Sequence, residues 1–506
     1  MNEYTFSGVA EALEVFDDMR EKAVAIGHAM GVIYLDSVTC APANTAAFRA
    51  RTLGTMSGIE YDITTDPRAK AAIAWLVEHQ EELDEQRRRE VTEYDRANRF
   101  ISSIPKDEYA AYSELIANAE AVWHKAKQEN DFASFAPYLE QIFDCNRRFA
   151  GYYCPEKPAY DVLLDRYERG LTMEKADGFF ASLRAEIVPL LSKVMAAPQV
   201  DDSFLDANYP VDKQRELSDY LMEVMGIDRS HCGIAESEHP FTINFGSDDV
   251  RITTHYHEDN VASSMYSVIH EGGHALYELG VGKEYERTFL SGGVSMGIHE
   301  SQSRLFENLI GRSEEFIALI YPKLQELFPE QLKGVDAYAF YKAVNKVEPS
   351  LIRTEADELT YALHVLVRYE LEKALIAGEL AVKDLPAAWN AKYKEYLGVD
   401  VPDDTHGVLQ DSHWSGGSVG YFPSYALGSA YGAQMIASLR EDVDVSAAIS
   451  GGDLSPIVNW LGERIYRHGC RYDPAWLIEN CCGTDFDPSF FVSYLTGKFS
   501  AIYDIR

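Results

Sequence analysis

MYSVIHEGGHALYELG, residues 265–280, contains the motif His270-Glu271-Gly272-Gly273-His274 (H-E-x-x-H) on a segment with the apolar spacing of a helix. One helical turn separates the two histidines, so both imidazoles project from the same face and suit two corners of a tetrahedral zinc site. Glu271 lies beside the first histidine, where it can serve as general base towards the attacking water. Inside a helix, Gly272 and Gly273 each cost roughly 1 kcal/mol against alanine. We interpret them as room for a second element or a substrate to approach this face.

The third zinc ligand is expected 26 residues after His274, at Glu300 in GIHESQSR (297–304). The following LFENLIGR has helical spacing, so Glu300 would lie early on a second helix that faces the first. Two histidines and one carboxylate leave a fourth position for water, as a catalytic zinc site requires. His299 competes as a ligand, but it points some 100° away around the helix. Many zinc hydrolases carry an acidic residue four residues after the glutamate ligand, where it orients a metal-binding histidine. Here that position is Arg304, so the sequence leaves open which groups orient the two histidines.

The composition is that of an acidic protein with a large core. The 506 residues are 46% hydrophobic and 12% aromatic, which argues against disorder. A net charge of -35 argues against nucleic acid or an anionic membrane as partner. We find neither an apolar run of about 18 residues nor a signal peptide. The seven cysteines form no metal-ligand ladder, and free thiols predict a reducing, cytoplasmic location.

Helical patterns dominate the chain, over residues 7–30, 86–150, 172–197 and 212–225 among others. Asp66-Pro67, Ser455-Pro456 and Asp473-Pro474 each predict a helix start, because a capping side chain or a proline in the first turn favours one. With no internal repeat or obvious linker, we expect one catalytic domain over residues 1–506. Residues 1–230 would form a helical groove wall or lid, 231–430 the metal and substrate site, and 431–506 the C-terminal helices.

One region departs from the helical pattern. HPFTINF (239–245) and VRITTHYH (250–257) are short β-branched or aromatic runs separated by a turn, which predicts a β-hairpin directly before the metal helix. A small sheet here would offer its edge to an extended peptide. Half of the 14 histidines lie between residues 231 and 299, which places the chemistry in this region.

An ordered series of blocks across residues 239–428 resembles the Taq-type family of zinc metallocarboxypeptidases. Each block alone is weak, but their joint order is very specific. The blocks are His239-Pro240-Phe241, Asp249-Val250-Arg251-Ile252-Thr253, HEGGH at 270–274, His299-Glu300-Ser301, IRTEAD at 352–357, GVLQDSHW at 407–414 and GYFPSYALG at 420–428.

The resemblance implies a mainly α-helical, neurolysin-like body with a deep active-site groove and a small β-hairpin or sheet beside the metal helix. It implies a zinc-dependent carboxypeptidase of broad specificity that releases single C-terminal amino acids from peptides with a free C-terminus. One zinc ion per chain is expected, and cobalt can support activity in such sites. The resemblance also implies a cytoplasmic homodimer.

A carboxypeptidase must recognise a free C-terminal carboxylate, and the planar guanidinium of arginine binds a carboxylate through two parallel hydrogen bonds. Arg353, in the family's I-R-x-x-A-D block, is our candidate, with Asp357 one turn later to brace its guanidinium. Arg251 lies on a predicted strand, where it can instead hold the hairpin to the site.

The oxyanion of the tetrahedral intermediate needs a hydrogen-bond donor opposite the metal. His413, followed twelve residues later by Tyr425, resembles the His and Tyr arrangement of neurolysin-like peptidases. Tyr421 is the alternative tyrosine. His239, His406 and Gln410 complete the expected substrate-binding residues.

Two other functions stay open at this point. A neurolysin-like oligoendopeptidase or dipeptidase would share the metal site but lack a dedicated carboxylate anchor. An inactive zinc-dependent peptide-binding protein would share the ligands, although Glu271 argues against it because pure binding needs no base there.

Overall fold

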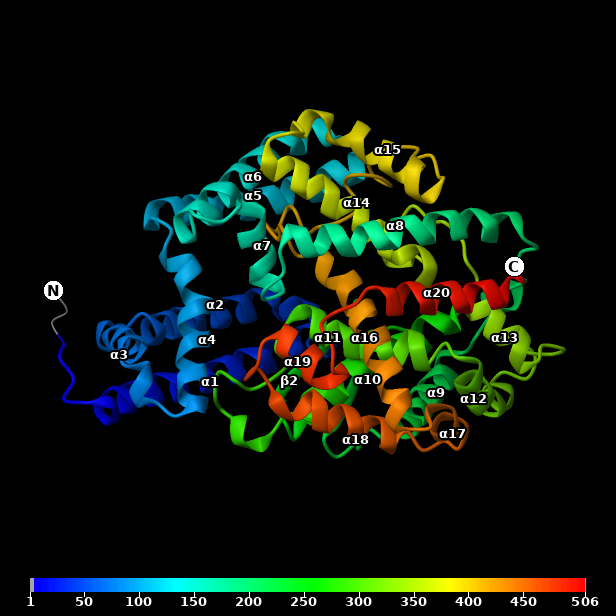
Figure 1. The fold of residues 1–506 in the computed structure, drawn as a ribbon, viewed down its shortest axis with the longest axis horizontal. Helices are drawn as coiled ribbons and strands as arrows, with labels where there is room; N and C mark the ends of the chain where they lie inside the picture. Colours follow the sequence, from blue (N-terminus) through cyan, green and yellow to red (C-terminus); the bar gives the residue numbers. More distant parts are fainter. Residues whose placement is uncertain (1–3, 506) are drawn as a thin grey trace.

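The computed structural model describes residues 4–505 and is mainly helical, with one small sheet (Figure 1). None of the described helices combines the length and apolarity needed to cross a bilayer. The helices before the sheet are α1 (Val9–Thr39), α2 (Ala46–Thr64), α3 (Pro67–Glu78), α4 (Glu85–Ser102), α5 (Lys106–Glu129), α6 (Phe132–Tyr153), α7 (Ala159–Tyr167), α8 (Met173–Ala196) and α9 (Val211–Val224). Those after it are α10 (Val261–Leu279), α11 (Met296–Arg304), α12 (Glu314–Leu327), α13 (Ala337–Val344), α14 (Glu358–Ala377), α15 (Leu385–Leu397), α16 (Pro423–Asp442), α17 (Val445–Ser450), α18 (Ser455–Arg464), α19 (Pro474–Cys482) and α20 (Ser489–Ile502).

Polar caps fix the starts of the two helices that carry the motif residues. Asn260 accepts the backbone N–H of Ser263 at 3.0 Å and so begins α10. Ser295 accepts the N–H of Ile298 at 3.1 Å and begins α11. Each side chain satisfies a backbone donor that has no partner within the first helical turn. The predicted start at Asp66 is confirmed in the same way, at the beginning of α3.

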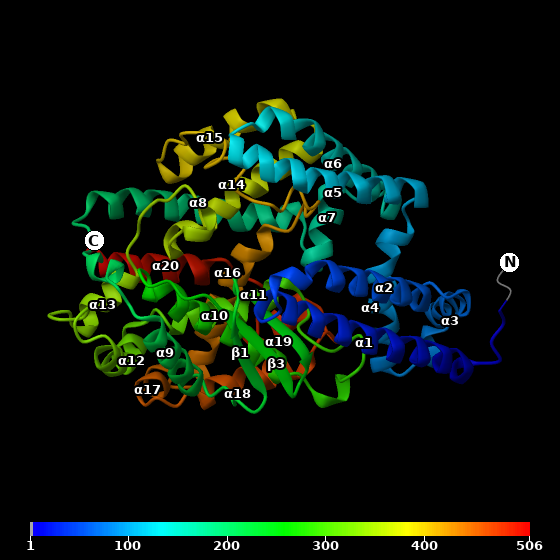
Figure 2. The same cartoon turned by 180° about the vertical axis from the view of Figure 1, so that it is seen from behind.

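The sheet has three strands, β1 (Cys232–Glu236), β2 (Thr242–Gly246) and β3 (Asp249–Thr254), in the order β1-β3-β2 (Figure 2). β2 and β3 are antiparallel, with Thr242 opposite Ile252, and form the predicted hairpin. β1 pairs parallel to β3, with Cys232 opposite Val250, and was not predicted as a strand. A parallel partner is joined through a crossover rather than a tight turn, so no local turn signal marks it. β2 is therefore an edge strand.

Glycines let α11 lie very close to both α10 and α16. A Cβ atom at Gly273 of α10 would stand 2.6 Å from the carbonyl oxygen of Gln302 and 2.8 Å from the Cα of Ser303. A Cβ atom at Gly428 of α16 would stand 2.6 Å from the Cβ of Glu300. All three distances are too short for any real Cβ, so only glycine permits these contacts. The room predicted for a neighbouring element at Gly273 is filled by the backbone of α11.

We expect Gly273→Ala to destabilise the protein by about 1–3 kcal/mol, because the added methyl group meets backbone that cannot rotate away. The control is Gly54→Ala in α2, where no atom lies within 4 Å of the added methyl group. That change should be neutral or stabilise by up to about 1 kcal/mol, since alanine favours a helix over glycine. Urea unfolding of the two variants measures both effects. Equal stabilities would contradict the packing described for α10 and α11.

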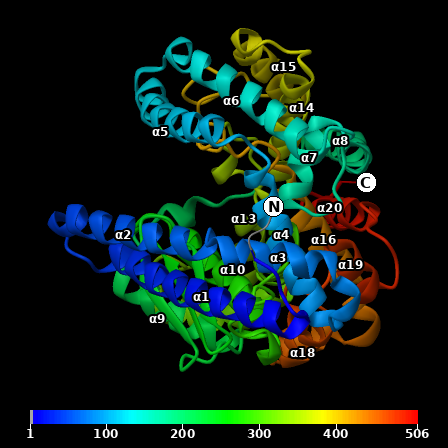
Figure 3. The ribbon, with the colours of Figure 1, turned by 90° about the vertical axis from the view of Figure 1, so that its left-hand side faces the viewer.

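Helices from distant parts of the sequence share a large core. In Figure 3, α5, α6, α14 and α15 gather at one end of the molecule and α1, α9, α10 and α18 at the other. One cluster of buried side chains joins both ends, from Phe143 in α6 and Leu363 in α14 to Ile269 in α10. A second, smaller cluster belongs to α1, α3 and α4 and includes Phe16 and Leu76. The first helices thus carry a core of their own beside the main one.

Candidate active site

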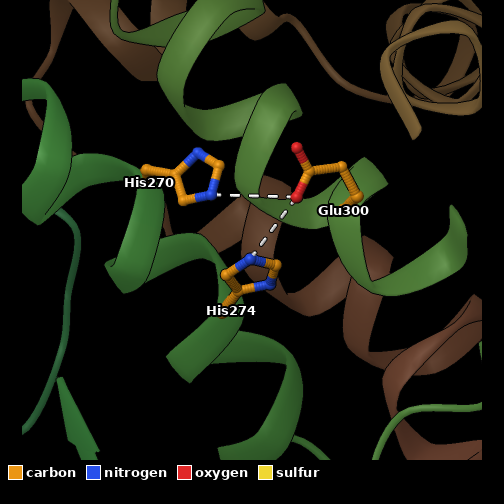
Figure 4. Close-up of side chains that lie close together, drawn as sticks. All are labelled: His270, His274 and Glu300. Carbon is orange, nitrogen blue, oxygen red and sulfur yellow. Dashed lines mark ion pairs between the residues drawn. The ribbon is translucent and has the colours of Figure 1, made fainter. Parts of the chain in front are cut away.

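α10 and α11 bring the three predicted metal ligands together (Figure 4). Nε2 of His270 lies 3.8 Å from Oε2 of Glu300, and Nε2 of His274 lies 3.7 Å from the same oxygen. One donor atom from each side chain lies within 4.8 Å of the other two. Around a tetrahedral zinc ion with ligands about 2.0–2.1 Å away, neighbouring donor atoms stand roughly 3.4 Å apart. The donor types and their spacing therefore fit a zinc ion.

His270 is supported by a carboxylate from the π-helical turn Leu305–Ile310, which continues α11. Oε2 of Glu307 lies 2.8 Å from Nδ1 of His270. Arg304 donates to Glu300 Oε1 at 2.7 Å and to Glu307 Oε2 at 3.1 Å, so it links the ligand to this supporting carboxylate. Burial lowers the pKa of His270, but the nearby Glu300 and Glu307 outweigh burial and raise it overall. This arrangement orients Nε2 of His270 towards the metal position.

His274 is supported by a second histidine. With Nε2 facing the metal position, Nδ1 of His274 carries the proton and donates to Nδ1 of His299 at 2.6 Å. Nε2 of His299 must then carry the other proton, which it donates to Glu278 Oε1 at 2.6 Å. Glu278 also accepts the N–H of Gly293 and the amide of Asn244. Both ring nitrogens of His299 are engaged, so His299 supports the predicted ligand His274.

Glu278 and Glu307 were not singled out from the sequence, although their spacing marks them. Glu278 follows His274 by four residues, one helical turn on the same face. Glu307 follows Glu300 by seven residues, two helical turns. An acidic residue one or two turns from a ligand is therefore the signal for the supporting carboxylates.

We expect His299→Ala to weaken zinc binding by about 10- to 100-fold, the usual effect of removing a group that orients a metal-binding histidine. Competition against a chromophoric chelator measures the affinity without using enzyme activity. His231→Ala removes a half-exposed histidine beside Asp248 and is the matched control. Unchanged zinc affinity in His299→Ala would show that His274 needs no such support.

The predicted base, Glu271, is buried and held by the edge strand. The hydroxyl of Thr242, the first residue of β2, donates to Glu271 Oε2 at 2.6 Å. Burial raises the pKa of Glu271, while the neighbouring His270 and the Thr242 hydrogen bond oppose that rise. A carboxylate with a raised pKa is a stronger proton acceptor than a solvated one.

The predicted carboxylate anchor, Arg353, lies in a buried charge cluster. Its Nε donates to Asp411 Oδ1 at 3.0 Å, and its Nη1 donates to the Tyr361 hydroxyl at 3.1 Å. Asp411 also binds Arg368, with Nη2 2.6 Å from Oδ2. Burial would raise the pKa of Asp411, but Arg368 and Arg353 outweigh it and hold the pKa well below its usual range. These three side chains carry two positive charges and one negative charge.

The prediction that Asp357 braces Arg353 is wrong. Arg353 lies in a single 3-10 turn, Arg353–Glu355, and α14 begins only after Asp357. Asp357 caps that helix by accepting the N–H of Thr360 at 3.0 Å, and it also accepts the N–H of Glu348 at 3.1 Å. No continuous helix joins residues 353 and 357, so the two side chains do not share a helical face.

His413 and Tyr425 form the predicted pair, with Nε2 of His413 3.2 Å from the Tyr425 hydroxyl. Burial lowers the pKa of His413 to about 4, although Asp411 opposes the shift, so the ring is neutral at physiological pH. The Cζ atom of Arg353 stands 4.9 Å from the centre of the Tyr425 ring. The Tyr421 ring lies 5.1 Å from that of Tyr425 and belongs to the same group. Tyr425 thus contacts both His413 and the arginine cluster.

A cavity of about 330 Å³ unites the predicted base, two of the predicted metal ligands and both tyrosines. Its lining residues are Pro240, Phe241, Thr242, Glu271, His274, Met296, His299, Glu300, Tyr421, Ser424 and Tyr425.

The sequence profile of the carboxypeptidase Taq (M32) metallopeptidase family matches residues 16–499. The chain belongs to this family. Carboxypeptidase 1 of Bacillus subtilis (strain 168) is 40% identical over 490 residues, which cover 96% of this chain and 98% of the relative. Thermostable carboxypeptidase 1 of Thermus thermophilus is 37% identical over 484 residues, which cover 92% of this chain and 94% of the relative. This M32 family member is accordingly a peptidase.

Solved structures agree with the family assignment over the whole fold. The M32 carboxypeptidase from Deinococcus radiodurans R1 superposes with a TM-score of 0.93 at 35% identity, covering 98% of this chain and 100% of that one. Metallocarboxypeptidase 1 of Trypanosoma cruzi gives a TM-score of 0.91 at 31% identity, with the same coverage. The mainly helical fold with a small sheet, predicted from the sequence, is thus confirmed as that of M32 carboxypeptidases.

The remaining predicted residues of this M32 peptidase lie around the site rather than in the lining of its cavity. Gln410 is buried and accepts the N–H of Arg353 at 2.9 Å, so it positions the anchor. His239 is exposed on the loop between β1 and β2. His406 is exposed and pairs with Asp403 at 2.7 Å. Arg251 pairs with Asp249 at 2.7 Å and lies over the Phe245 ring, so it contacts the hairpin itself.

Proposed function

We propose that this M32 peptidase is a zinc-dependent carboxypeptidase that releases single C-terminal amino acids from peptides with broad specificity. The observation that carries the proposal is the position of the Arg353 cluster. Arg353 lies against the ring of Tyr425, and Tyr425 lines the cavity that also holds Glu271 and two of the proposed metal ligands. A substrate carboxylate bound at the cluster would leave the last peptide bond within that cavity.

The charge of the cluster favours an anion. Arg353 and Arg368 share Asp411 and keep one positive charge in excess among the three. The side chain of Arg353 is only 7% exposed, and an uncompensated buried charge costs free energy. A substrate carboxylate would remove that cost. It would also accept hydrogen bonds from the guanidinium N–H groups that Asp411 and Tyr361 leave free.

The residues divide the chemistry between them. Zinc held by His270, His274 and Glu300 would polarise the scissile carbonyl and lower the pKa of water to about 7. Glu271 would accept a proton from the attacking water and pass it to the departing amine. Its contact with Thr242 keeps the carboxylate in place during both transfers.

Tyr425 is the proposed donor to the developing oxyanion. Nδ1 of His413 is buried without a hydrogen-bond partner among the described residues, whereas its Nε2 faces the Tyr425 hydroxyl. If the neutral ring carries its proton on Nε2, it donates to the Tyr425 oxygen. The tyrosine hydrogen is then free to point towards the substrate. Tyr421 stays the alternative.

Mass spectrometry of a mixed peptide pool tests the proposal. Incubation with zinc-loaded protein should give a ladder of peptides shortened one residue at a time from the C-terminus. A chelator should abolish the ladder, and added zinc or cobalt should restore it. Fragments from internal cleavage would favour the oligoendopeptidase alternative. Bound zinc without any cleavage would favour the peptide-binding protein.

Further expectations from the family resemblance belong to the same proposal: one catalytic domain with a neurolysin-like groove, working as a homodimer in the cytoplasm. The seven cysteines are all free, which supports a reducing compartment.

A further inference from the structure

The cavity has three apolar lining residues that take no part in the chemistry described above. Pro240, Phe241 and Met296 line it beside Glu271 and His299. Met296 is the first residue of α11 and remains 43% exposed, so burial in the core does not account for it. Phe241 precedes the edge strand β2, and its ring is 5.7 Å from that of Tyr34 in α1, which supports it from behind.

The direction of a bound substrate follows from the proposed function, on which this inference rests. Arg353 contacts the ring of Tyr425, which lines the cavity, and would hold the C-terminal carboxylate on that side. Phe241 and Thr242 lie at the start of the edge strand and line the same cavity, where Thr242 donates to the proposed base Glu271. A chain that runs from Arg353 across the metal site towards β2 places its penultimate residue against Phe241 and Met296.

We infer that Pro240, Phe241 and Met296 form the subsite for the penultimate residue of the substrate, and that it selects bulky apolar side chains over acidic ones. Methionine is flexible and polarisable, so it can adapt to side chains of different shapes. Among the described residues that line the cavity, Glu271 and Glu300 are acidic and none is lysine or arginine. An acidic penultimate side chain would lose its hydration there without gaining a cationic side chain as partner.

Peptides with a blocked N-terminus and a free C-terminus that differ only in the penultimate residue test the subsite. With the C-terminal residue held constant, kcat/KM for leucine or phenylalanine should exceed that for alanine by about tenfold, the usual gain from an apolar pocket. The aspartate peptide should be slower than the alanine peptide. A parallel series varies the C-terminal residue instead.

Met296→Asp is the informative variant. Asp at the first position of a helix favours the macrodipole, so α11 should still form. We expect about a tenfold loss of kcat/KM for leucine and phenylalanine peptides, a smaller loss for alanine, and a relative gain for a lysine peptide. Met296→Ser separates the loss of apolar contact from the added charge. Met195→Asp in α8 is the matched control, because Met195 is also 43% exposed.

The outcomes separate this inference from the function beneath it. If the wild-type protein releases C-terminal residues equally well after leucine and aspartate, the subsite is overturned and the carboxypeptidase stands. A Met296→Asp effect that is uniform for all penultimate residues, or that appears only in the C-terminal series, also overturns it. No release from any peptide would remove both the subsite and the proposed function.

Discussion

Replacing Glu271 with glutamine is expected to lower kcat by about 10²- to 10⁴-fold, the usual contribution of a positioned general base. Glutamine has nearly the same shape as glutamate. Its amide oxygen can still accept the hydrogen bond that the Thr242 hydroxyl donates to Glu271 at 2.6 Å. The amide has no basic lone pair for the proton of the attacking water. Steady-state hydrolysis of a free-acid peptide measures the change.

The control for Glu271→Gln is metal binding. Glu271 is not among the three ligands, so zinc content and affinity should match those of the wild-type protein. Loss of zinc would mean that the variant acts through the metal site. Activity within a few-fold of the wild type, with zinc bound, would show that another group takes the proton.

Replacing Arg353 with alanine is expected to lower kcat/KM for free-acid peptides by about 10²- to 10⁴-fold. The basis is the loss of two charge-assisted hydrogen bonds, each worth roughly 1.5–3 kcal/mol. The variant should fold, because Asp411 keeps its 2.6 Å contact with Arg368 and the excess positive charge disappears. Arg353→Lys should recover only part of the loss, since an ammonium group lacks the planar fork.

Amidated peptides provide the selective readout for Arg353. They present no carboxylate to the anchor, so their slower hydrolysis should change little in Arg353→Ala. Arg251→Ala distinguishes the two arginines that the sequence offers. If discrimination between acid and amide is lost in Arg251→Ala and kept in Arg353→Ala, the anchor has been assigned to the wrong residue.

The sequence predicts that the three candidate metal ligands lie together, and they do, because a regular helix decides their geometry. The spacing of His270 and His274 fixes their common face, and the cap at Ser295 makes Glu300 early in the next helix. The helix starts at Asp66 and Asp473 could be predicted for the same reason. In each case the signal, an aspartate followed by a proline, lies directly at the helix start.

The partners of these residues depend on packing between distant segments, which a single sequence does not display. Arg353 binds Asp411, 58 residues away, and not Asp357, because the chain between 353 and 357 leaves the helical path. The π-helical turn at 305–310 that carries Glu307 has no local sequence signal beyond a helical pattern. β1 was missed because it pairs with β3, which follows it only after β2. No tight turn joins these two strands in the sequence.

The proposed activity requires a substrate with a free C-terminal carboxylate and a metal ion at the catalytic centre. The most direct measurement is the rate at which zinc-loaded wild-type protein hydrolyses one peptide in two forms, with a free and with an amidated C-terminus. We expect the free acid to lose its last residue at least about a hundredfold faster, given two charge-assisted hydrogen bonds to the carboxylate. Equal rates for the two forms would contradict it.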